Sequence, residues 1–226
     1  MFNGDIDYVS SYQQYMDGVL SYPLYYAMRD SFVYEKSMHG LETLLGPNGS
    51  YKKKFKDVNL LGTFIDNHDN SRFLYNQASW DLYKNALAMT VFTSGIPIIY
   101  YGSEQGYSGG DDPANRESLW PNYDTNHELY KFIQTLVTSR KVMGISTQTQ
   151  VQRYVNDHFY AFSRDKVLVC LTNTGSQLDI DLDYLPTSYV EGTEVCNLLD
   201  SSDCVRVTDG SIHVTLNGLP KVYAPV

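Results

Sequence analysis

The 226 residues include 17 Lys and Arg against 26 Asp and Glu, so the net charge is −9 and no basic stripe can neutralise the phosphates of a nucleic acid. Hydrophobic residues make up 42% of the chain and charged residues 19%, a balance that excludes a disordered protein. No run approaches the roughly 20 apolar residues of a transmembrane helix, and no basic and apolar signal region follows Met1. We expect a soluble chain that has no export signal of its own and binds neither nucleic acid nor membrane.

The first 59 residues predict a loop, a short strand and a helix. The opening is polar and rich in tyrosine, which predicts an irregular loop. An apolar strand is expected over residues 18–22, and Pro23 favours the first turn of a helix, where its missing amide hydrogen costs nothing. The helix should run to Phe32, and turn residues at 46–49 interrupt further helix. A strand that leads directly into a helix is half of a βα unit.

A second buried strand, over residues 60–65, ends in a polar cluster. Its side chains are apolar or β-branched, which suits a strand covered on both faces, and the cluster after it is Asp66, Asn67, His68 and Asp69. In barrels of alternating strands and helices, the active site lies at the carboxyl ends of the strands. The cluster is therefore a candidate site, although a His and Asp pair also orients loops that have no chemistry.

Two further βα units are expected before residue 144. Ser79 can cap a helix that ends at Gly95, and Pro97 prevents its continuation. Another strand is predicted over residues 96–101, and a capping box at residues 125–128 opens the next helix. The apolar stripe of that helix consists of Leu129, Phe132, Ile133, Leu136 and Val137.

Residues 144–226 predict an antiparallel β-sandwich. Apolar and polar side chains alternate with a period of two at residues 178–183 and 212–216, as they do in strands with one buried face. Turn sequences separate the strands at residues 174–175, 209–210 and 217–218. The chain is therefore expected to have an α/β domain over residues 1–143 and an all-β domain over residues 144–226.

The α/β part contains three βα units, which form parallel strands with crossover helices. Three units do not close a barrel of eight strands. On the pattern alone, residues 1–143 are either an open sheet or the second half of a larger barrel.

The three cysteines fall into two groups. Cys196 and Cys204 are separated by a short turn-like segment, so they can close a hairpin in an oxidising compartment. Cys170 lies inside the apolar run VLVCL and is expected to be a buried free thiol. The odd number of cysteines leaves the disulfide open.

Three segments contain motifs in a distinctive order: GVLSYPLYY, LLGTFIDNHDNSRF and GIPIIYYGSEQGYSGGDDPANRESLW. Together they resemble the second half of a fungal-type α-amylase of glycoside hydrolase family 13. FIDNHD is similar to the family's motif at the end of the seventh barrel strand, and DPANRE is similar to its substrate-contacting loop after the eighth strand. The resemblance implies the C-terminal portion of a (β/α)8 TIM barrel followed by the family's antiparallel β-sandwich domain.

The resemblance also implies an activity, retaining hydrolysis of the α-1,4-glucosidic bonds of starch or glycogen. Asp69 matches the carboxylate that stabilises the oxocarbenium-like transition state, and His68 matches a histidine that hydrogen-bonds sugar hydroxyls. Gly4 matches a glycine whose backbone lies against bound sugar. Asp112 and Arg116 are candidate substrate contacts, although an Asp and an Arg four residues apart also pair with each other.

Other groups of the family have no counterpart in these 226 residues. The resemblance places the nucleophile Asp on the fourth strand and the acid/base Glu on the fifth, and Met1 falls just after the position of that Glu. The chain is therefore expected to be inactive alone, because the third carboxylate supplies neither nucleophile nor proton donor. The full-length relative is expected to be a secreted monomer that binds calcium, mostly through ligands in its N-terminal half.

Two other functions fit the same residues. A related α-glucosidase or transglycosylase would act on short substrates or transfer the sugar to another sugar, and the length of the products would separate it from an amylase. A non-catalytic, amylase-like carbohydrate-binding protein would have kept the fold and lost the chemistry. The sequence upstream of the chain would separate that protein from an enzyme.

Several other conspicuous residues are expected to be structural. No metal site is assigned to this chain, because four histidines have no partner at a metal-ligand spacing: His39, His127, His158 and His213. The two tryptophans, Trp80 and Trp120, are expected to pack against other side chains. Alternation places three aspartates on the solvent face of one strand: Asp179, Asp181 and Asp183.

Overall fold

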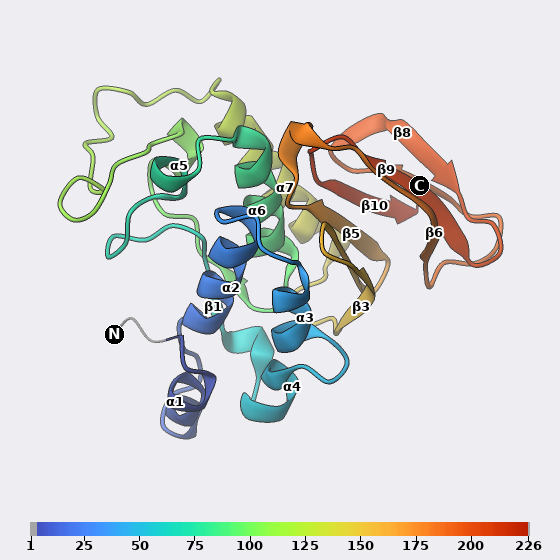
Figure 1. Ribbon diagram of the computed structural model, residues 1–226, viewed down its shortest axis with the longest axis horizontal. Helices are drawn as coiled ribbons and strands as arrows, with labels where there is room; N and C mark the ends of the chain where they lie inside the picture. Colours follow the sequence, from blue (N-terminus) through green and yellow to red (C-terminus); the bar gives the residue numbers. More distant parts are fainter. Residues whose placement is uncertain (1–3, 226) are drawn as a thin grey trace.

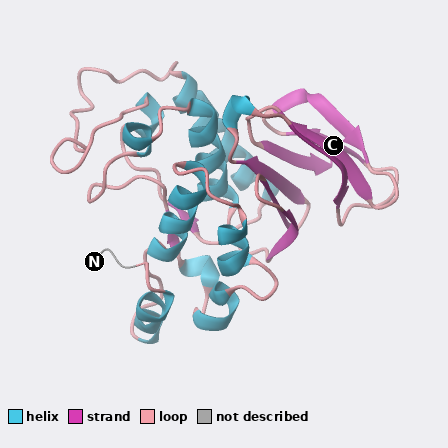
Figure 2. Cartoon of the chain, in the orientation of Figure 1, coloured by secondary structure: helices cyan, strands magenta, loops and turns pink. Residues whose placement is uncertain are grey.

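The computed structural model describes residues 4–225, in which the helices and the antiparallel strands occupy opposite sides of the molecule (Figures 1 and 2). The position of Met1, taken above from the family resemblance, lies outside the described residues. The helices are α1 (Ile6–Ser11), α2 (Tyr22–Phe32), α3 (His39–Leu45), α4 (Ser50–Lys54), α5 (Phe73–Asn76), α6 (Trp80–Phe92) and α7 (Glu128–Met143), with 3₁₀ turns η1 (Tyr12–Gln14), η2 (Val58–Leu60), η3 (Ser103–Gln105) and η4 (Gly175–Gln177). No helix among the described residues is long and apolar enough to cross a membrane.

The strands fall into three sheets. The parallel pair β1 (Gly62–Thr63) and β2 (Ile96–Pro97) lies among the helices. Six antiparallel strands follow in the order β3-β4-β5-β10-β7-β8, and β6 pairs with β9 in a two-stranded ribbon. Their bounds are β3 (Gln150–Val155), β4 (Phe159–Arg164), β5 (Val167–Thr172), β6 (Ile180–Pro186), β7 (Glu194–Asn197), β8 (Asp200–Arg206), β9 (Ser211–Leu216) and β10 (Lys221–Pro225).

The parallel strands are shorter than predicted. The segment over residues 18–22 forms a single parallel bridge, between Leu20 and Gly62, and Pro23 lies in the first turn of α2 as predicted. Backbone bonds continue this arrangement on the other side of β1, where Ile96 N donates to Leu61 O at 2.8 Å and Ile98 N donates to Thr63 O at 2.8 Å. Three chain segments therefore run parallel side by side, which is consistent with a portion of a TIM barrel.

The first predicted loop and one predicted helix end differ from the structure. The opening contains α1, whose N-cap Asp5 accepts from the amides of Asp7 and Tyr8. Helix α6 begins at the predicted cap, since Ser79 Oγ accepts from Leu82 N, but it ends before Gly95. Gly95 has a φ of 123°, and a Cβ there would lie 2.4 Å from Leu61 O, so glycine is required by the close approach of β1.

The predicted capping box of α7 is wrong. His127 is the N-cap, and its Nδ1 accepts from Leu129 N at 3.2 Å. The predicted apolar stripe is correct at Leu129, Ile133 and Leu136, which are buried, whereas Val137 is 44% exposed. An imidazole nitrogen can replace the usual hydroxyl or carboxylate cap because it also offers an acceptor lone pair.

One apolar core joins the helices to the antiparallel strands. Buried side chains of α2, α6 and α7 form a single cluster with one face of the six-stranded sheet, which includes Phe162, Val169 and Val222. The opposite face, which includes Leu168, packs against ribbon residues such as Val214. The antiparallel strands are as predicted, but this core runs across residue 143, so the division into two domains there stays a prediction.

Two of the three cysteines form a disulfide, and the third is a free thiol. Cys196 on β7 and Cys204 on β8 face each other across the hairpin, with their Cα atoms 4.0 Å apart, and they form a disulfide. Cys170 on β5 is a buried free thiol, and burial raises the pKa of that thiol. The expectation for Cys170 is confirmed, and the open question of the disulfide is answered by the bond.

Asn85 connects the helical side to the strands by side-chain hydrogen bonds. This residue is completely buried on α6, where its Oδ1 accepts from Thr172 N at 2.9 Å and its Nδ2 donates to Gly218 O at 2.8 Å. A Cβ on Gly218, whose φ is 90°, would lie 2.5 Å from the Gly175 carbonyl carbon. The tight turn and the buried amide therefore hold the end of β5 and the chain before β10 against α6.

We predict that Asn85→Ala lowers the free energy of unfolding by about 3 kcal/mol, because it leaves the Thr172 amide and the Gly218 carbonyl without buried partners. Urea unfolding followed by circular dichroism measures this change. Gln134→Ala, an exposed position on α7, is the matched control and should unfold at the wild-type urea concentration. Equal stability of the Asn85 variant and the control would contradict the connection.

Candidate active site

Asp66, which lies just after β1 in the chain, is buried and holds several elements together by hydrogen bonds. Its Oδ1 accepts from Phe73 N at 2.7 Å, and its Oδ2 accepts from the hydroxyls of Tyr83 at 2.5 Å and Ser103 at 3.1 Å. These donors come from α5, α6 and η3, so one carboxylate joins three elements to the strand end. Burial, with a smaller contribution from the charge of Asp66, raises the pKa of the Tyr83 hydroxyl well above its ordinary value, so the hydroxyl stays a donor.

Asn67 organises the loop that follows. Its Oδ1 accepts from the amides of Asp69 and Asn70, both at 3.0 Å, which forms a compact side-chain-capped turn. Asn115 in the long loop before α7 is buried and donates to His68 O at 3.0 Å and Asn70 O at 2.8 Å. The backbone of residues 67–70 is therefore held from within and from the neighbouring loop.

The Asp69 carboxylate is partly exposed beside two candidate partners. Its side chain is 29% exposed, its Oδ1 lies 3.2 Å from His68 Nε2, and its Oδ2 accepts from the Tyr22 hydroxyl at 3.5 Å. Burial, and next the charge of Asp69, raises the pKa of Tyr22 to about 12, so the hydroxyl remains protonated at neutral pH. The arrangement presents a carboxylate, an imidazole and a phenol hydroxyl together at the end of β1.

Arg116 and Asp112 form the pair that their spacing allowed. Arg116 Nε lies 3.1 Å from Asp112 Oδ1 and also donates to His68 O at 3.2 Å. Both side chains are about half exposed, at 46% and 53%. The pair therefore lies directly beside the residue 67–70 loop, with charged groups still open to solvent.

Gly4 lies near the same place through a tyrosine cluster. It is exposed, and a Cβ on it would lie 2.8 Å from Cδ2 of Tyr26. The Tyr26 ring lies 6.3 Å from the ring of Tyr22, the partner of Asp69. Glycine is thus required for the close approach of this backbone to the tyrosines.

An ion pair between the buried Arg72 and the partly exposed Glu117, which no sequence pattern predicts, supports the site. Arg72 is completely buried, and its Nε donates to Glu117 Oε2 at 2.6 Å while its guanidinium lies over the ring of Tyr100 at 4.5 Å. Glu117 Oε1 accepts from Gly109 N at 2.6 Å, so the pair fastens the long loop to the chain after Asp69. Both charges were visible in the sequence, but 45 residues separate them and no spacing rule connects them.

Two structural expectations from the sequence are wrong. Trp120 does not pack, because it is 93% exposed on the long loop, whereas Trp80 lies 5.5 Å from the ring of His127. His213 has a partner, since its Nε2 lies 2.6 Å from Asp181 Oδ1 on the neighbouring strand of the ribbon. Asp179, Asp181 and Asp183 are exposed, as predicted.

Comparisons with known proteins agree on one family. The family described as "Alpha amylase, catalytic domain" matches residues 1–166. The "Beta/alpha-amylase" of Paenibacillus polymyxa is 38% identical over 230 residues, which cover 96% of this chain and 18% of that protein. "Alpha-amylase 1" of Schwanniomyces occidentalis is 36% identical over 236 residues, which cover 100% of this chain and 46% of that protein. A solved α-amylase structure from Malbranchea cinnamomea has a TM-score of 0.90 and 35% identity, covering 100% of this chain and 49% of that chain.

The fold and these matches place the chain in a class of proteins that includes glycoside hydrolases. More narrowly, the chain belongs to the α-amylase family, glycoside hydrolase family 13, as the FIDNHD and DPANRE motifs predicted. It spans about half the length of the fungal α-amylases that it matches, and less of the bacterial relative. The family match extends past residue 143, through β3 and β4.

We predict that Asp66→Ala lowers the free energy of unfolding by about 3–5 kcal/mol, because three buried donors lose a charged acceptor. Tyr83→Phe should cost less, about 1–2 kcal/mol, since two donors to the carboxylate remain. Asp69→Ala is the matched control in the same loop, and we expect it to unfold close to the wild type because its carboxylate is partly exposed and accepts no buried donor at short distance. Thermal and urea unfolding measure all three. Loss of stability in the Asp69 variant equal to that in the Asp66 variant would contradict the separate roles.

Proposed function

We propose that this chain supplies the transition-state-stabilising part of a retaining α-amylase active site that acts on the α-1,4-glucosidic bonds of starch or glycogen. The observation that supports this proposal best is the partly exposed Asp69 carboxylate, held beside His68 by a loop whose backbone is anchored from two sides. A group with a stabilising role must be fixed before the charge develops, because reorganisation during the reaction would cost part of the stabilisation.

The proposed roles follow from the chemistry of each side chain. As the glycosidic bond breaks, positive charge develops on the sugar ring, and the negative charge of Asp69 stabilises it. The Tyr22 hydroxyl donates to Asp69, the His68 ring lies beside it, and both are suited to contact sugar hydroxyls around it. Arg116 and Asp112 contact the sugar from the long loop, and the backbone at Gly4 approaches it from the tyrosine side.

The rest of the chemistry belongs outside these 226 residues in this proposal. Retaining hydrolysis needs a nucleophile and an acid/base about 5 Å apart, and a third carboxylate replaces neither. The open edges of the parallel segments support a larger barrel, because Leu20 is 49% exposed, Ile96 54% and Ile98 40%. Apolar side chains at strand edges are covered in closed barrels.

Calcium is expected for the full-length relative, and the resemblance places most of its ligands in the N-terminal half. Calcium prefers six to eight oxygen ligands. Among residues 4–225, the one group of three His, Cys, Asp or Glu side chains close enough to share a metal contains an imidazole and lies on the β6–β9 ribbon. No step of the proposed reaction is therefore assigned to calcium here.

Secretion and a monomeric state of the parent enzyme are parts of the same proposal.

We predict that Asp69→Asn lowers kcat by roughly 10²–10³-fold, because it removes a preorganised charge of the transition state. The measurement uses a hybrid in which this chain replaces the matching 46% of Schwanniomyces occidentalis Alpha-amylase 1, with starch as substrate. Circular dichroism confirms that the variant is folded. An unchanged kcat in the folded variant would refute the role of Asp69. Long internal fragments among the products would separate an amylase from an α-glucosidase or transglycosylase.

Arg116→Ala in the same hybrid should raise KM about tenfold with a smaller change in kcat, since it removes about one charge-assisted hydrogen bond to bound sugar. Arg206→Ala is the matched control, because Arg206 is an exposed arginine on β8 whose Nη1 donates to Gly192 O, in the antiparallel part of the chain. Steady-state kinetics on maltooligosaccharides measure both variants. Equal KM values in the two variants would exclude sugar contact by Arg116.

A further inference from the structure

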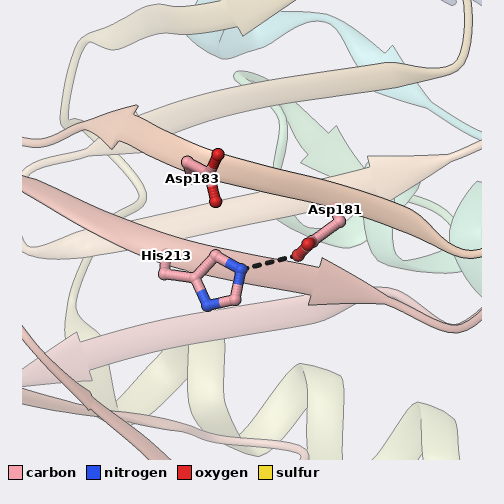
Figure 3. Close-up of side chains that lie close together, drawn as sticks. All are labelled: Asp181, Asp183 and His213. Atoms are coloured by element: carbon pink, nitrogen blue, oxygen red, sulfur yellow. Dashed lines mark hydrogen bonds and ion pairs between the residues drawn. The ribbon is translucent and has the colours of Figure 1, made fainter.

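The ribbon formed by β6 and β9 gathers three possible metal ligands on its outer face. Asp181 and Asp183 come from β6 and His213 from β9, and one ligand atom of each lies within 4.8 Å of the other two (Figure 3). All three side chains are exposed, so an ion from solution can reach them without any rearrangement of the core.

The backbone register explains why these side chains meet. Asp181 pairs with Thr215 and Leu182 with Val214, but a β-bulge lies between Leu182 and Leu185. The bulge places two residues of β6 against one residue of β9, so Asp183 comes to the same place as His213. The opposite face of the ribbon is fastened to the sheet through Leu185, Ile212, Val214 and Leu216, which are buried. The three ligands therefore project from a fixed frame.

The charges of the cluster favour a cation. His213 Nε2 lies 2.6 Å from Asp181 Oδ1, which also accepts from Thr215 Oγ1 at 2.8 Å. The Asp183 side chain has no ion pair or hydrogen bond among residues 4–225. Arg206 on β8 lines the same hollow of the surface, and its Nη1 donates to Gly192 O at 3.2 Å. Two carboxylates thus lie close together beside a single imidazole, and a divalent ion would neutralise both carboxylates.

We propose that Asp181, Asp183 and His213 bind a divalent first-row transition-metal ion, with water in the remaining positions. The donor set of one imidazole nitrogen and two carboxylate oxygens suits Zn²⁺, Ni²⁺ or Cu²⁺ and not calcium, which prefers oxygen ligands only. In the contact with Asp181, His213 Nε2 donates its hydrogen to the carboxylate. On binding, Nε2 gives up that hydrogen, the lone pair left on Nε2 binds the metal, and Thr215 continues to orient the Asp181 carboxylate as an outer partner. The metal would hold the two strands of the ribbon together, independently of the carbohydrate site.

The test is a titration of the 226-residue chain with Zn²⁺ by isothermal calorimetry, followed by thermal unfolding with and without the ion. The wild type should bind one Zn²⁺ per chain and melt at a higher temperature in its presence. His213→Ala and Asp183→Asn should each weaken binding about tenfold or more and remove most of the thermal shift. His39→Ala is the matched control, because His39 is an exposed histidine that pairs with a single carboxylate, Glu42, at 2.8 Å.

Each remaining outcome would overturn the proposal. Equal Zn²⁺ affinity in the wild type and both cluster variants would place binding elsewhere, and loss of binding in the His39 variant would place it on α3. No saturable binding by the wild type would leave the Asp181 and His213 contact as an ordinary surface ion pair. Calcium binding as tight as Zn²⁺ binding would contradict the role of the imidazole. If His213→Ala does not fold, Asp183→Asn still decides the test, because the asparagine side chain has nearly the same shape as the aspartate that it replaces.

Discussion

The buried carboxylate of Asp66 is the interaction on which the site depends. A charge without partners in the protein interior is very unfavourable, so the strand end can exist only where donors converge on it. Those donors are the Phe73 amide and the hydroxyls of Tyr83 and Ser103, and they bring α5, α6 and η3 to a single point. Because Asp66 precedes Asp69 by three residues, the position of the proposed transition-state stabiliser follows from the position of this anchor.

The site is a set of loops fastened to one another at their bases. Asn115 and the ion pair of Arg72 with Glu117 tie the long loop to the chain around Asp69, and both Asn115 and Arg72 are completely buried. The side chains proposed to meet sugar, such as His68 and Arg116, remain exposed above this support. The division gives a rigid base and an open binding surface, an arrangement that suits a catalytic centre.

The sequence predicted those features that depend on local patterns. The cap at Ser79, the helix start at Pro23 and the antiparallel strands follow from capping chemistry, proline geometry and a period of two. The polar cluster at the end of a buried strand was visible for the same reason. Asp69 and His68 were assigned their roles by resemblance to the family, and those roles stay predictions.

Features that depend on contacts between distant residues were not predictable. Arg72 and Glu117 meet across 45 residues, and a bulge between Leu182 and Leu185 changes the register that brings His213 to Asp181. Few backbone hydrogen bonds join β1 to its two parallel neighbours, so these strands are short. No sequence pattern specifies where such pairing ends. The exposure of Trp120 follows from the path of a long loop, which likewise has no periodic signal.

The most direct measurement compares starch hydrolysis by the purified 226-residue chain with hydrolysis by its hybrid with the fungal relative. We expect turnover by the hybrid and none by the chain alone, because one stabilising carboxylate supplies neither a nucleophile nor a proton donor. Starch hydrolysis by the chain alone that disappears on Asp69→Asn substitution would contradict this expectation, since the 226 residues would then contain a complete active site.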